Sequence, residues 1–215
     1  MSPRPKITDV RREEIVRAAL EVISQRGFQD TRVADIAERA QTSAPAVLYH
    51  FRSKGEILDA VVSLAEDLFY AEVEATLADE GGPAERLVRF LENAARDDDG
   101  EASVSMWRVW VEIWTRALRG GHTATTRQLL DRRWRAILSE TIAEGIAAGE
   151  FSASADPAVV ALTLASLMDG LAVQFALGDP DVGPELMTEA LVLAAQRLLD
   201  TDLSPYRLRV AEVAR

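Results

Sequence analysis

Residues 27–58 read GFQDTRVADIAERAQTSAPAVLYHFRSKGEIL. The pattern predicts one short helix over about 33–40 and a second over about 44–51. Ser43 is a good N-cap for the second helix, and Pro45 falls in its first turn, where the missing N–H costs nothing. Two short helices joined by a short turn form a helix-turn-helix pattern. The pattern alone is weak evidence for function, because many all-α proteins contain such corners.

Helical periodicity continues from this segment in both directions along the chain. Upstream, a helix over about 9–26 with Thr8 as its N-cap ends at Gly27. The apolar stripe of this helix consists of Ile15, Ala19, Val22 and Ile23. Downstream, we expect helices over 54–77, 83–96, 102–118, 125–148, 157–177 and 184–199. The sequence therefore predicts an all-α fold of nine helices without a sheet, and leaves the order of the tail 200–215 open.

Four expectations about burial and capping accompany these helices. We assign Leu48 and Phe51 to the core, and the apolar stripe of helix 54–77 includes Leu68 and Phe69. The helix over 102–118 is apolar nearly all round, which predicts burial on most of its sides. Asp156 followed by Pro157 is a typical start for the helix over 157–177.

Composition excludes several classes of functional site. The 215 residues include no cysteine, which excludes thiolate catalysis, iron–sulfur clusters and disulfides. The only histidines, His50 and His122, are too few for a histidine-rich metal site. The aspartates of 97–100 are consecutive and lack the alternation of an EF-hand loop, so we do not interpret them as a calcium site. No metal and no cofactor are expected.

A run of nearly uncharged residues over 157–178 is long enough to cross a bilayer. It contains Asp169, with Thr163, Ser166 and Gln174 nearby, which favours a buried helix of a soluble protein. The N-terminal residues carry charge but no apolar segment follows them, so we expect no secretory signal. Together these features predict a cytoplasmic protein.

Charge is distributed unevenly over a chain whose net charge is −11. Residues 1–54 contain ten Lys and Arg against seven Asp and Glu, a net charge of +3, whereas 55–215 carry a net −14. A basic head on an acidic body is expected when one domain meets phosphate and the other does not. Chance could produce the same excess over 54 residues, so the motifs have to decide between these two explanations.

One string of residues resembles the DNA-binding segment of the TetR family over about residues 8–60. It consists of Gly27-Phe28, Thr31, Val33-Ala34-Asp35-Ile36-Ala37, Ser43, Leu48-Tyr49-His50-Phe51, Ser53-Lys54 and Ile57-Leu58. The resemblance implies a three-helix helix-turn-helix head within the nine-helix fold. The chain departs from the family pattern at Arg32, at Gln41-Thr42 and at Ala44-Pro45, so its operator cannot be taken from other members.

The physical chemistry of the head agrees with the resemblance and nominates DNA-contacting residues. Tyr49, His50 and Lys54 are expected against phosphates, as are the free N–H groups at Ser43. Ala44 and Pro45, at the start of the second short helix, suit a thymine methyl group. The candidate base readers are the polar residues Arg32, Gln41 and Thr42. The full candidate set is Arg32, Gln41, Thr42, Ser43, Ala44, Pro45, Tyr49, His50 and Lys54. Alternatively, Tyr49 belongs to the edge of the core and Arg32 is only a solvated helix start.

The remainder of the chain is similar to the C-terminal domain of BetI-type repressors. The similar segments are Trp107, Trp110 to Trp114, Arg133-Trp134, Gly145 to Phe151, Asp156-Pro157 and Leu167 to Leu171. This implies a DNA-binding domain over 1–54 and a ligand-binding and dimerisation domain over 55–215, with a homodimer formed through helices 157–177 and 184–199. Small residues there would admit a partner helix, namely Ala161, Ala165, Ala172 and Ala176. Larger residues supply apolar area, namely Leu164, Leu167, Leu171 and Phe175.

Aromatic residues in the acidic domain suggest a ligand pocket. Trp107, Trp110 and Trp114 share one face of helix 102–118, and the other candidates are Trp134, Asp169 and Phe175. Indole faces with a carboxylate are suited to an organic cation. A neutral apolar ligand is a second possibility. The third is that the tryptophans are ordinary core residues and Asp169 pairs with a neighbouring helix or with a second copy of the chain.

These observations predict a ligand-responsive transcriptional repressor that binds a near-palindromic operator as a homodimer. Two other classes compete with it. An all-α enzyme is disfavoured because the chain contains no GxSxG, HExxH or P-loop motif. A helical adaptor without a role on DNA would not explain the basic head. The sequence leaves open the operator, the regulated genes, the effector, the choice between repressor and activator, and the number of dimers per operator.

Overall fold

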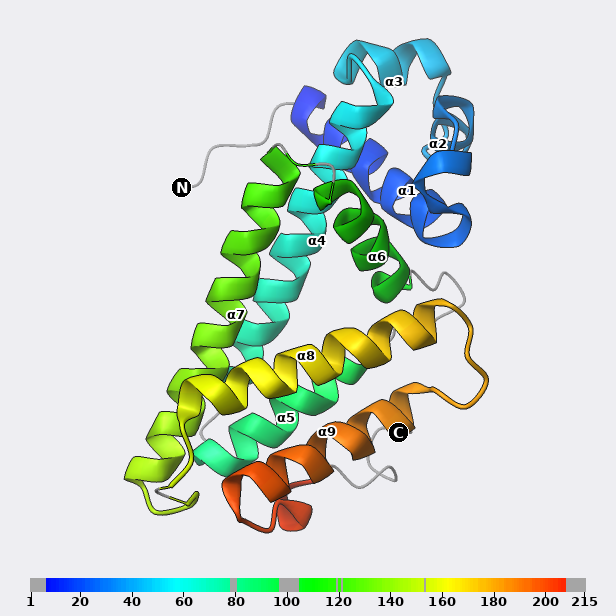
Figure 1. Cartoon of the computed structure of the whole chain (residues 1–215). Helices are drawn as coiled ribbons and strands as arrows, with labels where there is room; N and C mark the ends of the chain where they lie inside the picture. The colour runs from blue at the N-terminus through cyan, green and yellow to red at the C-terminus, as the bar shows by residue number, and fades with distance from the viewer. Residues whose placement is uncertain are drawn as a thin grey trace, which may run out of the picture. The chain divides into compact units, whose positions relative to one another are not determined.

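A computed structural model of the chain describes residues 7–77, 81–96, 105–118, 120, 122–152 and 154–207. Within these ranges the chain forms nine α-helices and one short 3₁₀ helix, with no strand (Figure 1). The helices are α1 (Ile7–Asp30), α2 (Val33–Arg39), α3 (Ala44–His50), α4 (Lys54–Leu77), α5 (Pro83–Ala95), α6 (Met106–Ala117), α7 (His122–Ala147), α8 (Pro157–Ala176), α9 (Pro184–Leu199) and η1 (Ser204–Tyr206). The predicted all-α class is confirmed, and the interpretation of 97–100 lies outside the described residues.

The chain divides into two compact units, which are described separately. Unit 1 consists of residues 1–69 and 97–125, and therefore contains α1, α2, α3, most of α4, and α6. Unit 2 consists of 70–96 and 126–215. Unit 1 is larger than the predicted DNA-binding domain 1–54, because α6 and the first part of α4 pack with the head. The functional boundary at residue 54 stays a prediction.

In unit 1, α1 packs on both α2 and α6, and α2 packs on α3. The predicted stripe of α1 is buried, and Ile36, Val47, Phe51 and Ile57 are completely inaccessible to solvent. The helix begins at Ile7, so the predicted N-cap at Thr8 is wrong. A capping preference is local, and the described helix includes two residues before the expected start at Asp9.

Gly27 interrupts α1 as predicted, with φ 76° and ψ 161°. Helical backbone resumes after it and continues to Asp30. The prediction that Leu68 on α4 belongs to the buried stripe is wrong, because this residue is 41% exposed. On α6, Val109, Trp110 and Ile113 are buried and only Arg108 and Thr115 are exposed, which agrees with the predicted burial on most sides. The exposure of Leu68 in the single chain is not revealed by an apolar count along the sequence.

In unit 2, α8 packs on α9, and α5 packs against both (Figure 1). The Asp156 carboxylate caps α8 as predicted, accepting hydrogen bonds from the backbone N–H of Ala158 at 2.9 Å and of Val159 at 3.3 Å. By length and hydropathy α8 is the one helix in the described ranges that could cross a membrane. One third of its apolar window is buried inside the chain, so the prediction of a buried helix holds for one face only.

Three of the four alanines that we expected to admit a partner helix on α8 face the core of the same chain, and Ala176 is half-buried. Ala161, Ala165 and Ala172 are at most 4% exposed, as is Leu164. The prediction that these alanines admit a partner helix is therefore wrong, because α8 uses them to pack within its own unit. Helical spacing alone cannot distinguish an intramolecular close approach from an intermolecular one.

Candidate functional site

The turn between α2 and α3 is held by backbone and side-chain hydrogen bonds. The Thr42 N–H donates to the Ala37 carbonyl at 2.8 Å, and Ser43 Oγ accepts from the Ala46 N–H at 3.3 Å, as its N-cap role predicts. Gln41 has φ 50°, a left-handed conformation that is costly for a residue with a Cβ atom. Arg11 Nη2 donates to the Gln41 carbonyl at 3.1 Å and holds this turn against α1.

The short helix α3 buries one face and exposes the other. Val47 and Phe51, four residues apart, are 0% exposed. Tyr49 is 83% exposed and Leu48 is 48% exposed, and both lie on the accessible face with Pro45. The assignment of Leu48 to the core is therefore wrong, as is the alternative that Tyr49 belongs to the core edge. In a helix of seven residues only one side packs against the core, so apolar and aromatic residues on the other side stay accessible.

The other candidate DNA-contacting residues lie in or next to this helix-turn-helix. Arg32, Gln41, Ser43 and Pro45 are exposed. Partly exposed are Thr42, Ala44, His50 and Lys54. The structure therefore leaves every candidate at least partly accessible within residues 32–54, and their contact with DNA stays a prediction.

Lys54 has an internal contact that the sequence did not indicate. Its Nζ donates to the Gln29 carbonyl at 3.0 Å and lies 4.4 Å from the centroid of the Phe28 ring. An ammonium group has three donors, so two of them remain for a phosphate. Lys54 therefore both supports the connection between α1 and α2 and carries a cation at the start of α4.

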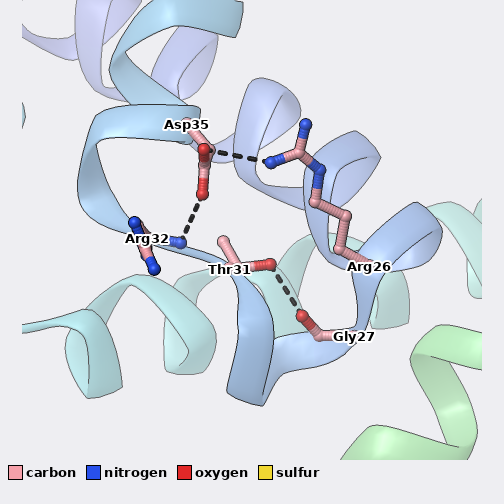
Figure 2. Close-up of polar contacts among 5 residues, drawn as sticks. All are labelled: Arg26, Gly27, Thr31, Arg32 and Asp35. Atoms are coloured by element: carbon pink, nitrogen blue, oxygen red, sulfur yellow. Dashed lines mark hydrogen bonds and ion pairs between the residues drawn. The ribbon is translucent and has the colours of Figure 1, made fainter.

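The connection from α1 to α2 is tied by side chains on both sides of it (Figure 2). The buried Thr31 donates from Oγ1 to the Gly27 carbonyl at 2.7 Å. Asp35 accepts the Arg32 N–H at 2.7 Å and the Arg26 guanidinium at 3.0 Å. The acidic N3 residue caps α2, which explains why Arg32 can stand at a position where a small hydroxyl residue is common.

Two cations of α1 were missed in the sequence analysis. Arg11 binds the turn before α3, and the exposed Arg12 lies with its guanidinium 4.8 Å from the centroid of the Phe51 ring. Both side chains therefore border the helix-turn-helix. The excess of positive charge in residues 1–54 was the only sequence signal for them, and it did not identify individual residues.

Three of the candidate ligand residues lie in unit 1, on α6. Trp110 is 7% exposed and meets Phe69 edge to face, with ring centroids 6.2 Å apart. Trp107 and Trp114 are half-buried. The indole N–H of Trp107 is buried without an acceptor among the described residues. Trp110 therefore fits the core interpretation, whereas Trp107 retains an unused donor.

The other three candidates lie in unit 2. Trp134 is 8% exposed and stacks on Phe90 at 5.5 Å between centroids, which is typical of a core residue. Phe175 is half-buried. Asp169 Oδ1 lies 3.9 Å from Arg127 Nη2, so the carboxylate pairs with a neighbouring helix, as one of the alternatives held.

Burial raises the pKa of two neighbouring carboxyl groups, those of Asp169 and Asp131. Desolvation raises the pKa of Asp169 to about 6, opposed by the positive charge of Arg127 and reinforced by the nearby Asp131 carboxylate. Desolvation also raises the pKa of Asp131, which lies 2.6 Å from the same guanidinium. Arg127 and Asp131 were not recognised from the sequence, because their contacts with α8 depend on tertiary packing. Among the described residues no acidic or histidine group is arranged to hold a metal ion.

Comparison with protein families shows two matches. The family model for bacterial regulatory proteins of the tetR family matches residues 15–61, which include the helix-turn-helix. The model for the C-terminal domain of BetI-type transcriptional repressors matches residues 83–200. Together the two models span most of the chain.

Individual relatives agree with these matches. The transcriptional regulator BetI of Burkholderia thailandensis is 28% identical over 207 residues, covering 94% of this chain and 98% of the relative. A regulator from Saccharomonospora viridis, solved in complex with choline, has a TM-score of 0.77 and 29% identity, covering 84% of this chain and 92% of the other. AibR, solved with isovaleryl coenzyme A and operator DNA, has a TM-score of 0.65 and covers 89% of this chain and 100% of its own. At 20% identity this match shows a shared fold.

Proposed function

Because this chain belongs to the TetR family of transcriptional regulators, we propose that it is a cytoplasmic repressor that binds a near-palindromic operator as a homodimer and releases it when a small molecule binds. The exposed face of α3 carries this proposal. Tyr49 is 83% exposed beside Leu48 and Pro45, on a helix whose other side buries Val47 completely. A helix of this size fits the major groove, and an exposed aromatic side chain has no folding role that explains it.

Two features support the proposed homodimer, namely the length of α3 and the exposed apolar surface of unit 2. A seven-residue helix reads too few base pairs for specificity, so two copies are needed. On α8, Val159 and Leu162 are 57% and 48% exposed, and Leu177, directly after this helix, is 79% exposed. On α9, Leu186 and Leu193 are 44% and 50% exposed. We propose that these accessible faces of α8 and α9 pair with a second copy, because an isolated chain would leave them in water.

Gly170 supports the proposal that the accessible face of α8 pairs with a second copy. It lies on the exposed side of α8 between Leu162 and Leu177, and a Cβ atom built on it would meet nothing within 4 Å. The surface there is open and lacks a side chain. A partner helix could approach the backbone closely at this point, which is the role that the buried alanines cannot fill.

For the effector we propose a small organic cation, with the Asp169 carboxylate as its counter-charge. The net charge of −14 over residues 55–215 supports this class, as does the choline bound to the Saccharomonospora viridis regulator. Arg127 already faces Asp169 at 3.9 Å, so a cation would have to compete with the guanidinium. A neutral apolar ligand would not need this exchange and is the second candidate.

Choline and its neutral carbon isostere 3,3-dimethylbutan-1-ol distinguish the two classes. We expect choline to raise the melting temperature of the wild type, and Asp169→Asn to abolish this rise. Equal shifts with both compounds, unaffected by the substitution, would identify a neutral effector. A rise in melting temperature follows from ligand binding to the folded state alone.

Footprinting on the DNA upstream of the protein's own gene tests the proposed function. We expect two protected half-sites related by an approximate dyad, with centres about one helical turn or a multiple of it apart. Affinity should fall steeply with salt, because phosphate contacts release counterions. A protein that is monomeric by light scattering and protects no DNA would contradict the proposal.

A further inference from the structure

One hydrogen bond joins α6 to the head across 84 residues of sequence. Glu112 Oε1 accepts the backbone N–H of Phe28 at 3.1 Å. Phe28 follows Gly27, whose ψ of 161° turns the next peptide out of the helical hydrogen-bond ladder. The carboxylate therefore satisfies a backbone donor that the interrupted helix leaves free.

Gly27 is required for this contact for two reasons. Its φ of 76° with ψ of 161° lies in a region that is accessible essentially to glycine alone. A Cβ atom at this position would also lie 2.8 Å from Glu112 Oε1, closer than such atoms approach. The glycine therefore both turns the chain and leaves space for the carboxylate.

The segment that Glu112 holds also positions the helices proposed to read DNA. Thr31 donates to the Gly27 carbonyl, and the following residues cap α2, which packs on α3. From the other side, Lys54 binds the Gln29 carbonyl and covers the Phe28 ring. The four residues after Gly27 are therefore the point where α1, α2, α4 and α6 meet.

A second polar contact runs from the next turn of α6. Arg116 Nη2 donates to Asp59 Oδ1 of α4 at 3.1 Å, and both side chains are partly exposed. An ion pair of this kind contributes little by itself. It does show that residues 112 and 116, one turn apart on α6, contact the segment after Gly27 and the first part of α4.

We propose that Glu112 is a positioning residue for DNA binding, which fixes the segment after Gly27 to α6 and transmits displacement of α6 to α2 and α3. The proposal rests on the proposed function and adds the residue through which it is regulated. α6 also carries Trp107, Trp110 and Trp114, so a change at these side chains has a direct connection to the DNA-reading helices.

Three substitutions separate the hydrogen bond from the charge. Glu112→Gln keeps an acceptor of the same reach, Glu112→Asp keeps the charge but shortens the side chain, and Glu112→Ala removes both. Glu140→Ala removes an exposed carboxylate of α7 and is the matched control. We expect the Asp and Ala variants to bind the operator about tenfold more weakly, whereas the Gln variant and the control stay within about twofold of the wild type.

Hydrogen exchange gives a readout that does not depend on affinity. We expect faster exchange at the Phe28 amide in the Asp and Ala variants and wild-type exchange in the Gln variant. In the wild type, operator binding should slow exchange in α6 as well as in the segment after Gly27. In the Asp and Ala variants the effect on α6 should be lost. The salt dependence of binding should be unchanged, because Glu112 contacts no phosphate.

The outcomes distinguish this proposal from the proposed function. Operator affinity and α6 protection that stay at wild-type levels in Glu112→Asp, with faster exchange at Phe28, would overturn the role of Glu112 and leave the function intact. A wild type that binds no operator overturns both. If the Ala variant does not fold, the Asp and Gln variants still differ only in reach and charge, and wild-type behaviour of both rejects the proposal.

Discussion

Asp169 on α8 and Arg127 on α7 face one another with 3.9 Å between Oδ1 and Nη2, and the same guanidinium lies closer to a second carboxylate, that of Asp131. Asp169 is therefore the less well compensated member of a partly buried cluster. Its pKa is raised to about 6 because desolvation outweighs the attraction of Arg127. The folded chain thus binds a proton at Asp169 more tightly than the unfolded chain does.

The upward shift of the Asp169 pKa predicts how this residue affects stability at different pH values. Between about pH 4 and pH 6 the folded state holds a proton that the unfolded state releases, so this contribution to stability falls as pH rises through that window. Asp169→Asn should therefore raise the melting temperature at pH 7.5 and leave it unchanged near pH 4. Asp67→Asn, at an exposed carboxylate of α4, is the control and should have no effect at either pH. A stabilisation that is the same at both pH values would contradict the assigned cause.

Lys54 should affect DNA binding through its charge. It should affect the stability of the head through its side-chain methylene groups. Lys54→Ala and Lys54→Met both remove the cation, and each should weaken binding to all sequences and make the salt slope shallower by about one. Lys54→Met keeps methylene contact with the Phe28 ring, so it should lose less stability than Lys54→Ala, which we expect to lose about 1 kcal/mol. Arg132→Ala, an exposed cation of α7, is the control.

The salt titration also tests Tyr49. If the double substitution Tyr49→Phe with Lys54→Met binds the operator with wild-type affinity and salt slope, neither residue contacts phosphate. The assignment of the α3 face to DNA would then be wrong.

Leu48 should contact a thymine methyl group in each half-site. Replacing that thymine by uracil in both half-sites removes two methyl groups, which corresponds to about 1.6 kcal/mol or roughly a fifteenfold loss of affinity. Leu48→Ala should lose a similar amount on the thymine operator and nothing further on the uracil operator. Leu118→Ala, at a residue that is 88% exposed beyond α6, should retain the full sensitivity to uracil. Additive losses in Leu48→Ala would show that no such contact exists.

Gln41 combines an unfavourable backbone conformation with an exposed side chain. Gln41→Gly should stabilise the head by roughly 0.5–1 kcal/mol, because glycine adopts φ 50° without strain. If the side chain reads a base, both Gln41→Gly and Gln41→Ala should change base preference at one or two positions, by roughly 1–3 kcal/mol. Chemical denaturation measures the first effect and binding-site selection the second. An unchanged preference in both variants would remove Gln41 from the readers.

The proposed dimer surface can be disrupted from either helix. Leu162→Asp on α8 or Leu193→Asp on α9 would place a charge on the face that pairs with a second copy, so each should produce monomers in light scattering and lose at least tenfold in operator affinity. Leu129→Asp changes an equally exposed leucine of α7, 59% accessible, and should remain dimeric. Dimers in both test variants would place the interface elsewhere.

Local chemistry made the helices predictable from the sequence. Ser43 and Asp156 cap their helices as expected, because an N-cap acts on backbone groups within three residues of it. The break at Gly27 and the start of α4 at Lys54 were likewise predictable. The candidate DNA-contacting residues were found in the same way, since they lie on one short segment whose motif is contiguous.

Properties that depend on distant segments required the tertiary structure. Leu48 is apolar and was assigned to the core, yet only the packing of α3 determines which of its faces is buried. Ala161 and its neighbours on α8 have the spacing of a helix contact, but the sequence does not say whether the contacting helix belongs to the same chain. The bond from Glu112 to Phe28 joins residues 84 positions apart. No periodicity or capping rule reaches that far, because each describes interactions within a few turns of one helix.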